Sequence, residues 1–301
     1  MNAPRALPGD VSSSRTIAPV SLVLLGFIGL GLAVIYGQVL LDLVADWRRD
    51  ENYAHGILIP PAVLWLIWTR RKESGRLVAD PSWDGAIVAG FGLALFIVGR
   101  AAVDFFLTRF SFVIVLAGLV VAARGWQQLR LWLFPLGLLA LAIPLPTLLL
   151  NEIAFPLQLL ASRMGVALLD VVGVPAFREG NLILLQGAIL EVAEACSGVR
   201  SLISLVTLAL VYGYVNRHSG LVRVALVSAV LPVVVVSNSL RVAGAGFSAH
   251  VYGADAARGF LHTFSGWLFF GLSVLVLVAV EQVAASFVAR RSSQPSKRGM
   301  R

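Results

Sequence analysis

The chain has 301 residues, of which 58% are hydrophobic and only 13% are charged. Its mean hydropathy of +0.86 excludes a soluble globular domain, which needs far more polar surface at this length. The net charge of +8 would suggest a nucleic-acid partner in a soluble protein, but here the basic residues cluster in short loops between apolar runs. We therefore expect a membrane protein without a nucleic-acid partner.

Apolar segments of about the length that crosses a bilayer as a helix recur along the chain. The first follows a polar tail over 1–16, and it is too long for a secretory signal core, so we expect it to be retained. The prediction is an all-α polytopic protein with a single transmembrane domain over 17–287 and a basic tail over 288–301. Its eight predicted spans are 17–41, 56–70, 84–103, 110–123, 131–150, 199–216, 221–238 and 264–287.

The distribution of basic residues orients these spans. Of the 24 Lys and Arg residues, fifteen fall on the side that holds both termini and nine fall on the other side. Because cytoplasmic loops carry the excess of positive charge, both termini are expected in the cytoplasm.

Residues 152–170 form a further apolar segment, which polar side chains interrupt. Glu152, Gln158, Arg163 and Asp170 recur at intervals that suit a helix lying in the membrane interface. A ninth span here would also move the basic C-terminal tail to the outer side. We expect an interfacial helix, although a membrane span stays open as the alternative.

A small β-hairpin is predicted after this helix. Gly180-Asn181 is a turn signal, and two short apolar runs surround Gln186-Gly187. The hairpin would lead the chain to Cys196, on the outer side, where an apolar helix begins.

Cys196 is the only cysteine, which excludes an intramolecular disulfide and a multi-cysteine metal site. The N-terminus of a helix favours the thiolate over the thiol, and Arg200 would add a cation on the same helix face. Glu191 and Glu194 would oppose a thiolate, so we expect them to point away from the sulfur or to pair with Arg200 or Arg241. The alternative is an inert thiol that only packs.

Asn238 and Arg241 lie three residues apart, at the outer end of the seventh predicted span. An arginine against an apolar helix is costly unless it faces the protein interior, which favours a functional role. It cannot act as a base, but it could hold an oxyanion, a thiolate or a carboxylate. The alternative is a snorkelling side chain that reaches lipid phosphates.

Three of the four histidines, His55, His250 and His262, fall on the predicted outer side. Each could act as a general acid or base near neutral pH, and each could equally be a hydrogen-bonded interfacial residue. His218 falls in a cytoplasmic loop, away from Cys196. No cofactor and no metal ion are expected.

Several motifs, in order along the chain, resemble the exosortase/archaeosortase family. "EACSGVRS" is similar to the family's nucleophile motif, "NSLRVAG" to its arginine motif and "HTFSGW" to the histidine motif of the bacterial exosortase branch. "NYAHGILIPPAVLWLIWTRR" is similar to an early His-Gly segment. The resemblance spans about residues 45–285, and the archaeal branch has a second arginine where this chain has His262.

The resemblance implies a membrane-embedded cysteine protease or transpeptidase of the bacterial inner membrane. It would cleave the C-terminal tripartite sorting signal of secreted proteins, which consists of a PEP-type motif, a transmembrane helix and a basic tail, and would pass the product to an acceptor at the outer face. Membrane lipid, exopolysaccharide machinery and a separate accessory protein are further candidate partners. Carried over residue by residue, the catalytic roles fall on Cys196, Arg241 and His262, and the substrate-binding or supporting roles on Asn238, Arg200, Glu194 and His55.

Two other classes of function stay open. A non-catalytic component of exopolysaccharide assembly or export would use Arg241 and His262 to line a polar cavity, and would keep its function in Cys196→Ser. An acyltransferase would keep the nucleophile but act on lipid, so that a trapped Cys196 adduct would contain fatty acid instead of peptide.

Overall fold

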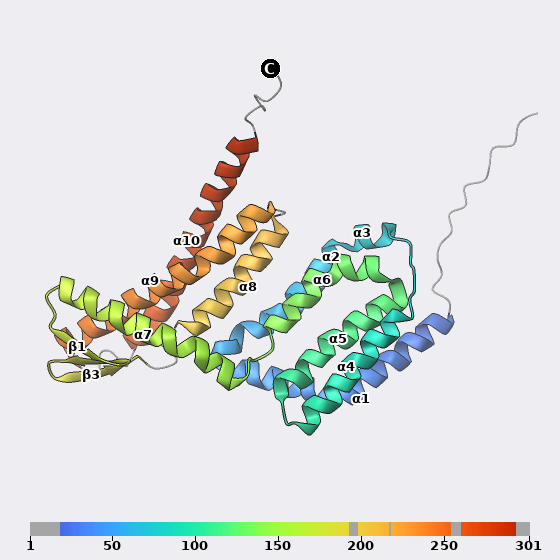
Figure 1. Ribbon diagram of the computed structural model, residues 1–301, viewed down its shortest axis with the longest axis horizontal. Coiled ribbons are helices and arrows are strands. Elements are labelled where there is room, and N and C mark those ends of the chain that lie inside the picture. Colours follow the sequence, from blue (N-terminus) through green and yellow to red (C-terminus); the bar gives the residue numbers. More distant parts are fainter. Residues whose placement is uncertain (1–18, 193–197, 217, 254–259, 293–301) are drawn as a thin grey trace, which may run out of the picture. The chain divides into compact units, whose positions relative to one another are not determined.

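The computed structural model describes residues 19–192, 198–216, 218–253 and 260–292. Contacts divide the chain into two units, Met1–Asp42 and Leu43–Arg301. The described part of the first unit belongs to helix α1 (Pro19–Arg49). The remaining helices are the 3-10 helix η1 (Glu51–Leu58) and α2 (Ile59–Thr69), α3 (Arg71–Arg76), α4 (Asp84–Ala101), α5 (Phe105–Arg124), α6 (Trp126–Leu141), α7 (Thr147–Val171), α8 (Val199–Val215), α9 (Gly220–Tyr252) and α10 (Phe260–Ser292) (Figure 1).

Six stretches of described helix are long and apolar enough to cross a membrane, and they lie in α1, α4, α5, α7, α9 and α10. Helix α8 is apolar but has only 17 residues. Helix α2 has 11 residues and is about 17 Å long, well short of a hydrocarbon core about 30 Å thick. The chain is thus a multi-pass, mostly helical membrane protein with a small sheet, but the predicted count of eight spans is not confirmed.

A break in the helix corrects the predicted span over 131–150. Helix α6 ends at Leu141 and α7 begins only at Thr147. Pro144 and Pro146 lie between them, and a proline lacks the N–H of a helical hydrogen bond and disfavours helical geometry in the preceding residue. The apolar run that suggested one span is therefore divided between two helices.

Helix α7 contains the whole segment that was predicted to lie in the interface. Its length and composition are those of a membrane span, whereas Figure 1 shows it at a steep angle to α8, α9 and α10, which run side by side. Its charged residues Glu152, Arg163 and Asp170 are exposed. The position of α7 relative to the bilayer stays a prediction.

Helices α4 and α5 pack as a close hairpin because glycines line their contact. A Cβ at Gly92 would lie 2.7 Å from Cγ2 of Val115, and one at Gly118 would lie 2.7 Å from Cα of Ala89. Small residues let helix backbones approach, and in a membrane this van der Waals packing replaces the hydrophobic effect between helices.

We predict that Gly118→Leu destabilises this hairpin by about 1–3 kcal/mol or more, because the new side chain would overlap the backbone of α4. Gly90→Leu is the matched control, since Gly90 is exposed and has no atom within 4 Å of an added Cβ. Thermal unfolding of the detergent-solubilised protein measures both changes. Equal melting temperatures for the two variants would contradict the close packing.

The predicted hairpin is confirmed and is extended by a strand. Strands β1 (Ala176–Glu179), β2 (Leu182–Leu185) and β3 (Ala188–Glu191) form an antiparallel sheet in the order β1-β2-β3. Both predicted turns are present, and Gly180 and Gly187 have the positive φ that such turns require. Ile183 and Leu185 are buried in one core cluster with residues of α7 and α9, so the sheet lies against these helices.

Helices α8, α9 and α10 share a separate core, which includes Leu205, Val230, Val234 and Leu277. At one end of this bundle, His218 Nε2 lies 2.9 Å from a carboxylate oxygen of Glu281. The bundle therefore has one polar end at the α8–α9 connection, and the candidate site lies elsewhere along it.

Candidate functional site

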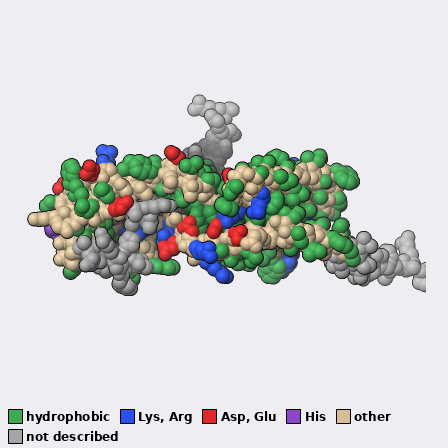
Figure 2. Space-filling view, turned by 90° about the horizontal axis from the view of Figure 1, so that it is seen from below, with side chains coloured by type: hydrophobic (Ala, Val, Ile, Leu, Met, Phe, Trp, Pro, Cys, Tyr) green, Lys and Arg blue, Asp and Glu red, His purple; other side chains and the backbone are tan. Residues whose placement is uncertain are grey.

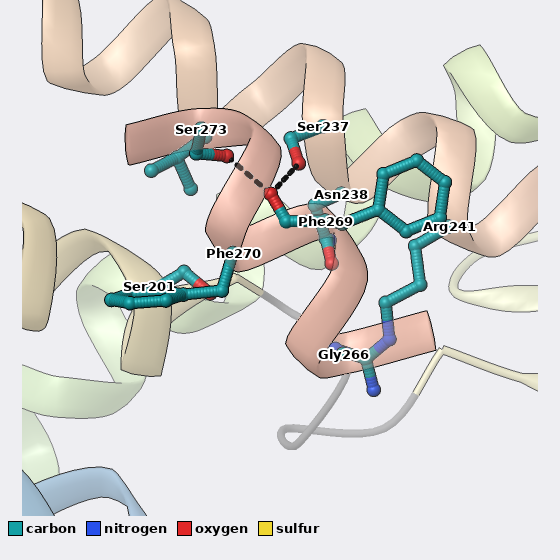
Figure 3. Close-up of a pocket in the computed structure, with 9 residues that line it drawn as sticks. Ser201, Ser237, Asn238, Arg241, Gly266, Phe269, Phe270 and Ser273 are labelled. Atoms are coloured by element: carbon teal, nitrogen blue, oxygen red, sulfur yellow. Dashed lines mark hydrogen bonds between the residues drawn. The ribbon is translucent and has the colours of Figure 1, made fainter. Parts of the chain in front are cut away.

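A small cavity lies between α8, α9 and α10. Its volume of about 10 Å³ gives room for about one water molecule or one oxygen atom. The side chains around it are partly polar, as Figure 3 shows. It is lined by Ser201, Val234, Ser237, Asn238, Arg241, Gly266, Phe269, Phe270 and Ser273.

Arg241 lies inside α9 and not at the end of a span, because the helix continues to Tyr252. With 33 residues, α9 is about 50 Å long and exceeds the hydrocarbon core, so this position can stand near the membrane surface. The side chain lines the cavity, and Figure 3 shows it reaching toward Gly266 of α10. A Cβ at Gly266 would lie 4.0 Å from Cζ of Arg241, so the missing side chain leaves room for the guanidinium group.

Asn238 stands nearly one turn before Arg241 and lines the same cavity. Only 6% of Asn238 is exposed. The prediction that Asn238 and Arg241 share one helix face agrees with this arrangement, and both side chains line the cavity between the three helices.

Two serine hydroxyls hold α10 at this position. The carbonyl oxygen of Phe269 accepts a hydrogen bond from Ser237 Oγ of α9 at 3.1 Å and another from Ser273 Oγ of α10 at 2.8 Å (Figure 3). The bond from Ser237 joins the two helices directly. It fixes which residues of α10 lie opposite Arg241.

Cys196 and Glu194 lie outside the described residues, but the chain on both sides of them is described. Val192 belongs to the same buried cluster as Val242 of α9. Gly198, which caps α8, has φ +84°, and a Cβ there would lie 3.4 Å from Cβ of Asn238. Of these described flanks, Gly198 thus lies against Asn238 of α9, and Val192 shares a buried cluster with residues of α9.

His262 belongs to the first turn of α10, and the structure does not describe its side chain. It stands four residues before Gly266, and positions four apart share one helix face. The approach of His262 to Arg241 therefore stays a prediction.

Arg200 pairs with a carboxylate that sequence reasoning did not select. Its Nη1 lies 2.6 Å from Glu51 of η1, whereas Glu191 is exposed in β3. Glu191 was expected to point away from the sulfur or to pair with Arg200 or Arg241, and the described Arg200 pairs with Glu51 instead. Because both partners are partly exposed, the pair adds little stability, but it links η1 to the first turn of α8.

A second ion pair joins α5 to α1 within the second unit. Arg109 Nη2 lies 2.6 Å from Asp46, in addition to the pair between Arg200 and Glu51. Figure 2 views the protein from below Figure 1 and shows acidic and basic side chains together in the middle of an otherwise largely hydrophobic face. Arg109 and Arg200 were both predicted on the outer side.

His55 lies in η1 and does not line the cavity between α8, α9 and α10. Its Nε2 lies 3.4 Å from the carbonyl oxygen of Leu141, and its ring is half-buried. Burial lowers the pKa of His55, while the backbone of Leu141 and of Asn52 acts in the opposite direction. His55 therefore contacts the end of α6, and its supporting role in the site stays a prediction.

Because its pKa is lowered in the folded state, His55 takes up a proton less readily there than in the unfolded chain, whose pKa is near 6.5. Stability is therefore expected to be complete above about pH 6.5 and to fall as the pH decreases through the folded pKa. We predict a smaller loss of melting temperature on acidification in His55→Gln than in the wild type. His250→Gln, at an exposed position, is the control, and identical pH profiles for all three proteins would contradict the prediction.

Sequence reasoning missed two residues that line the cavity, Gly266 and Ser237, and also Glu51, which pairs with Arg200. Gly266 follows His262 by one turn within the histidine motif, and Ser237 precedes Arg241 by one turn, so helical spacing could have pointed to both. No local signal could have found Glu51, because its contact with Arg200 joins parts of the chain far apart in sequence.

One comparison with known proteins gives a match. The family model described as transmembrane exosortase (Exosortase_EpsH) matches residues 47–279. These residues are more than half of the chain, and they include Cys196, Arg241 and His262. No curated protein and no solved structure matches the chain.

Proposed function

The chain belongs to the transmembrane exosortase family, and we propose that it is a cysteine peptidase or transpeptidase that cleaves C-terminal sorting signals of secreted proteins. The reaction would take place at the outer face of the bacterial inner membrane. One observation carries this proposal. Arg241 and Asn238 line one cavity, Gly198, two residues after Cys196 in the sequence, lies against Asn238, and Gly266, four residues after His262, lies opposite Arg241.

In the first half of the reaction, the Cys196 thiolate attacks the carbonyl carbon of the scissile peptide bond. The tetrahedral intermediate collapses, the C–N bond breaks, and a thioester joins the substrate to the sulfur. The leaving amine takes a proton from His262, which acts as the general acid.

In the second half, His262 removes a proton from the acceptor nucleophile. The acceptor attacks the thioester, and the thiolate leaves as the new bond forms. A transferred group or a hydrolysed product results, depending on whether the acceptor is a second molecule or water.

Arg241 suits the oxyanion that forms in both halves. A guanidinium group stays protonated, donates several hydrogen bonds in a fixed plane and needs no reorganisation once its stem is packed. The cavity beside it holds about one oxygen-sized group. Asn238, on the same wall, supplies an amide that can support this charge.

The start of α8 favours the thiolate before the substrate arrives. Gly198 is the N-cap, so the unpaired N–H groups and the positive end of the helix dipole lie two residues from Cys196 in sequence. Arg200 and its partner Glu51 would hold η1 beside this helix start and support the site from that side.

Co-expression with a tagged substrate that bears a C-terminal sorting signal tests the proposal. The wild type is expected to shorten the substrate, and added hydroxylamine is expected to release a substrate hydroxamate from the thioester. Cys196→Ala should do neither while it accumulates in the membrane at the wild-type level. Unchanged shortening by Cys196→Ala would overturn the proposal, and a fatty-acid hydroxamate would assign the site to lipid acyl transfer.

A further inference from the structure

Strand β3 has one edge that no described strand covers. The sheet order is β1-β2-β3, so β3 pairs with β2 on one side and with no strand on the other among the described residues. Its residues Ile189 and Glu191 are exposed. An open edge of this kind is a template for another extended chain.

The pairing geometry shows which backbone groups this edge presents. The two-residue turn at Gln186-Gly187 makes Leu185 and Ala188 a hydrogen-bonded pair, and such pairs recur at every second residue. Val192 N also donates a hydrogen bond to Asn181 O, at 2.9 Å, as this alternation of hydrogen-bonded pairs requires. The N–H and C=O groups of Ile189 and Glu191 therefore point away from β2, and no backbone bond outside the ladder uses them within the described chain.

Strand β3 lies against α9, the helix that carries Arg241. Val192 follows β3 at once and is buried in one cluster with Val242, the neighbour of Arg241 in α9. Cys196 follows four residues later in the sequence. A chain bound along β3 would thus be led toward the segment that holds the nucleophile.

We propose that the substrate's cleavage segment binds in extended form as a fourth strand on the edge of β3 that no described strand covers. This inference rests on the function proposed above. The N–H and C=O groups of the substrate would pair with those of Ile189 and Glu191, which gives affinity that does not depend on the substrate's sequence. Alternate substrate side chains would point to the two faces of the sheet, where specificity can be read.

The outward N–H and C=O groups of Ile189 and Glu191 favour a peptide as the ligand of this edge. Lipid could cover the apolar side chain of Ile189, which is 62% exposed, but an acyl chain offers no donors and acceptors to pair with a strand edge. A second copy of the chain would have to bring an open edge of its own and would compete with the substrate. An extended peptide also presents its scissile carbonyl without a competing internal hydrogen bond.

Proline substitutions test the outward N–H groups. Glu191→Pro removes an N–H that makes no hydrogen bond to β2. Prolines are tolerated at such edge positions. Glu191→Ala removes the same side chain but keeps the N–H. We expect KM for the tagged substrate to be about three- to tenfold higher in Glu191→Pro than in Glu191→Ala, as the loss of one hydrogen bond predicts.

The opposite edge of the sheet offers a matched control. Arg178 of β1 has its N–H directed away from β2 by the same alternation, on the side remote from β3. Arg178→Pro is expected to leave KM at the value of Arg178→Ala. The quantity to compare is the KM of the proline variant divided by the KM of the alanine variant. The same value of this ratio at Glu191 and at Arg178 would overturn the docking proposal. Labelling of Cys196, the only thiol, with a maleimide checks that each variant keeps an accessible site.

Photocrosslinking tests binding without catalysis. A benzophenone amino acid at Ile189, in full-length Cys196→Ala in membranes, should crosslink to a tagged signal peptide more strongly than one at Phe177 of β1, which is also exposed. This crosslink in the absence of any processing by the wild type would support docking and reject the proposed function. Processing without preferential crosslinking at Ile189 would reject docking alone, as would a crosslink to a second copy of the chain.

Discussion

Replacing Arg241 by methionine is expected to lower kcat for signal cleavage by about 10²–10³-fold, with a much smaller change in KM. The guanidinium group lines an oxygen-sized cavity and lies opposite Gly266, so its hydrogen bonds are expected to strengthen when the carbonyl oxygen becomes an oxyanion. A group that acts mainly in the transition state changes kcat more than it changes substrate binding.

Arg241→Lys separates charge from geometry. Lysine keeps the positive charge but loses the planar array of donors, so we expect its activity to lie between that of the wild type and that of Arg241→Met. Arg163→Met, at an exposed position on α7, is the control for loss of a positive charge. Initial rates over a range of substrate concentrations give kcat and KM. Wild-type kcat in Arg241→Met would contradict an oxyanion role.

Gly198→Ala is expected to lower activity at least about tenfold and to destabilise the protein by about 1–3 kcal/mol. Two effects act at this position. The φ of +84° is costly for any residue with a Cβ, and the added methyl group would lie 3.1 Å from Cγ1 of Val234. The start of α8, two residues after Cys196, would then have to move away from α9.

Gly173→Ala measures the backbone effect alone, because Gly173 has φ +77° and no atom within 4 Å of an added Cβ. We expect it to lose stability but to keep its activity. The double variant Gly198→Ala with Val234→Ala should recover part of the activity, since the shorter side chain at 234 restores space. Cleavage rates and melting temperatures of the four proteins check this, and equal activity of Gly198→Ala and Gly173→Ala would contradict the crowding against α9.

Local chemistry explains which predictions agree with the structure. Hydropathy is a property of a short window, so the apolar helices of a multi-pass membrane protein were visible before any packing was known. Gly180-Asn181 and Gln186-Gly187 are turn signals over two residues, and both turns formed where they were expected. The motifs around Cys196, Arg241 and His262 were sufficient to indicate the family.

The number of membrane spans and the residues at which they end depend on more than the hydropathy of a short sequence window. Two prolines divided the apolar run at 131–150 between α6 and α7. Helix α9 passed through Asn238 and Arg241 without ending, because these polar side chains face a cavity that α8 and α10 complete. A polar residue ends an apolar pattern in sequence, but it need not end a helix when neighbouring helices surround it.

The sequence by itself determined the class of protein, the small hairpin, the family and the order of the three proposed catalytic residues, because each follows from the composition or from a short run of neighbours. Only the tertiary structure decided that Gly198 lies against Asn238, that Arg241 faces Gly266, and that Glu51 reaches Arg200. These contacts join residues between 25 and 149 positions apart. They arise from the packing of α8, α9 and α10 and of η1 on α8, which no local pattern encodes.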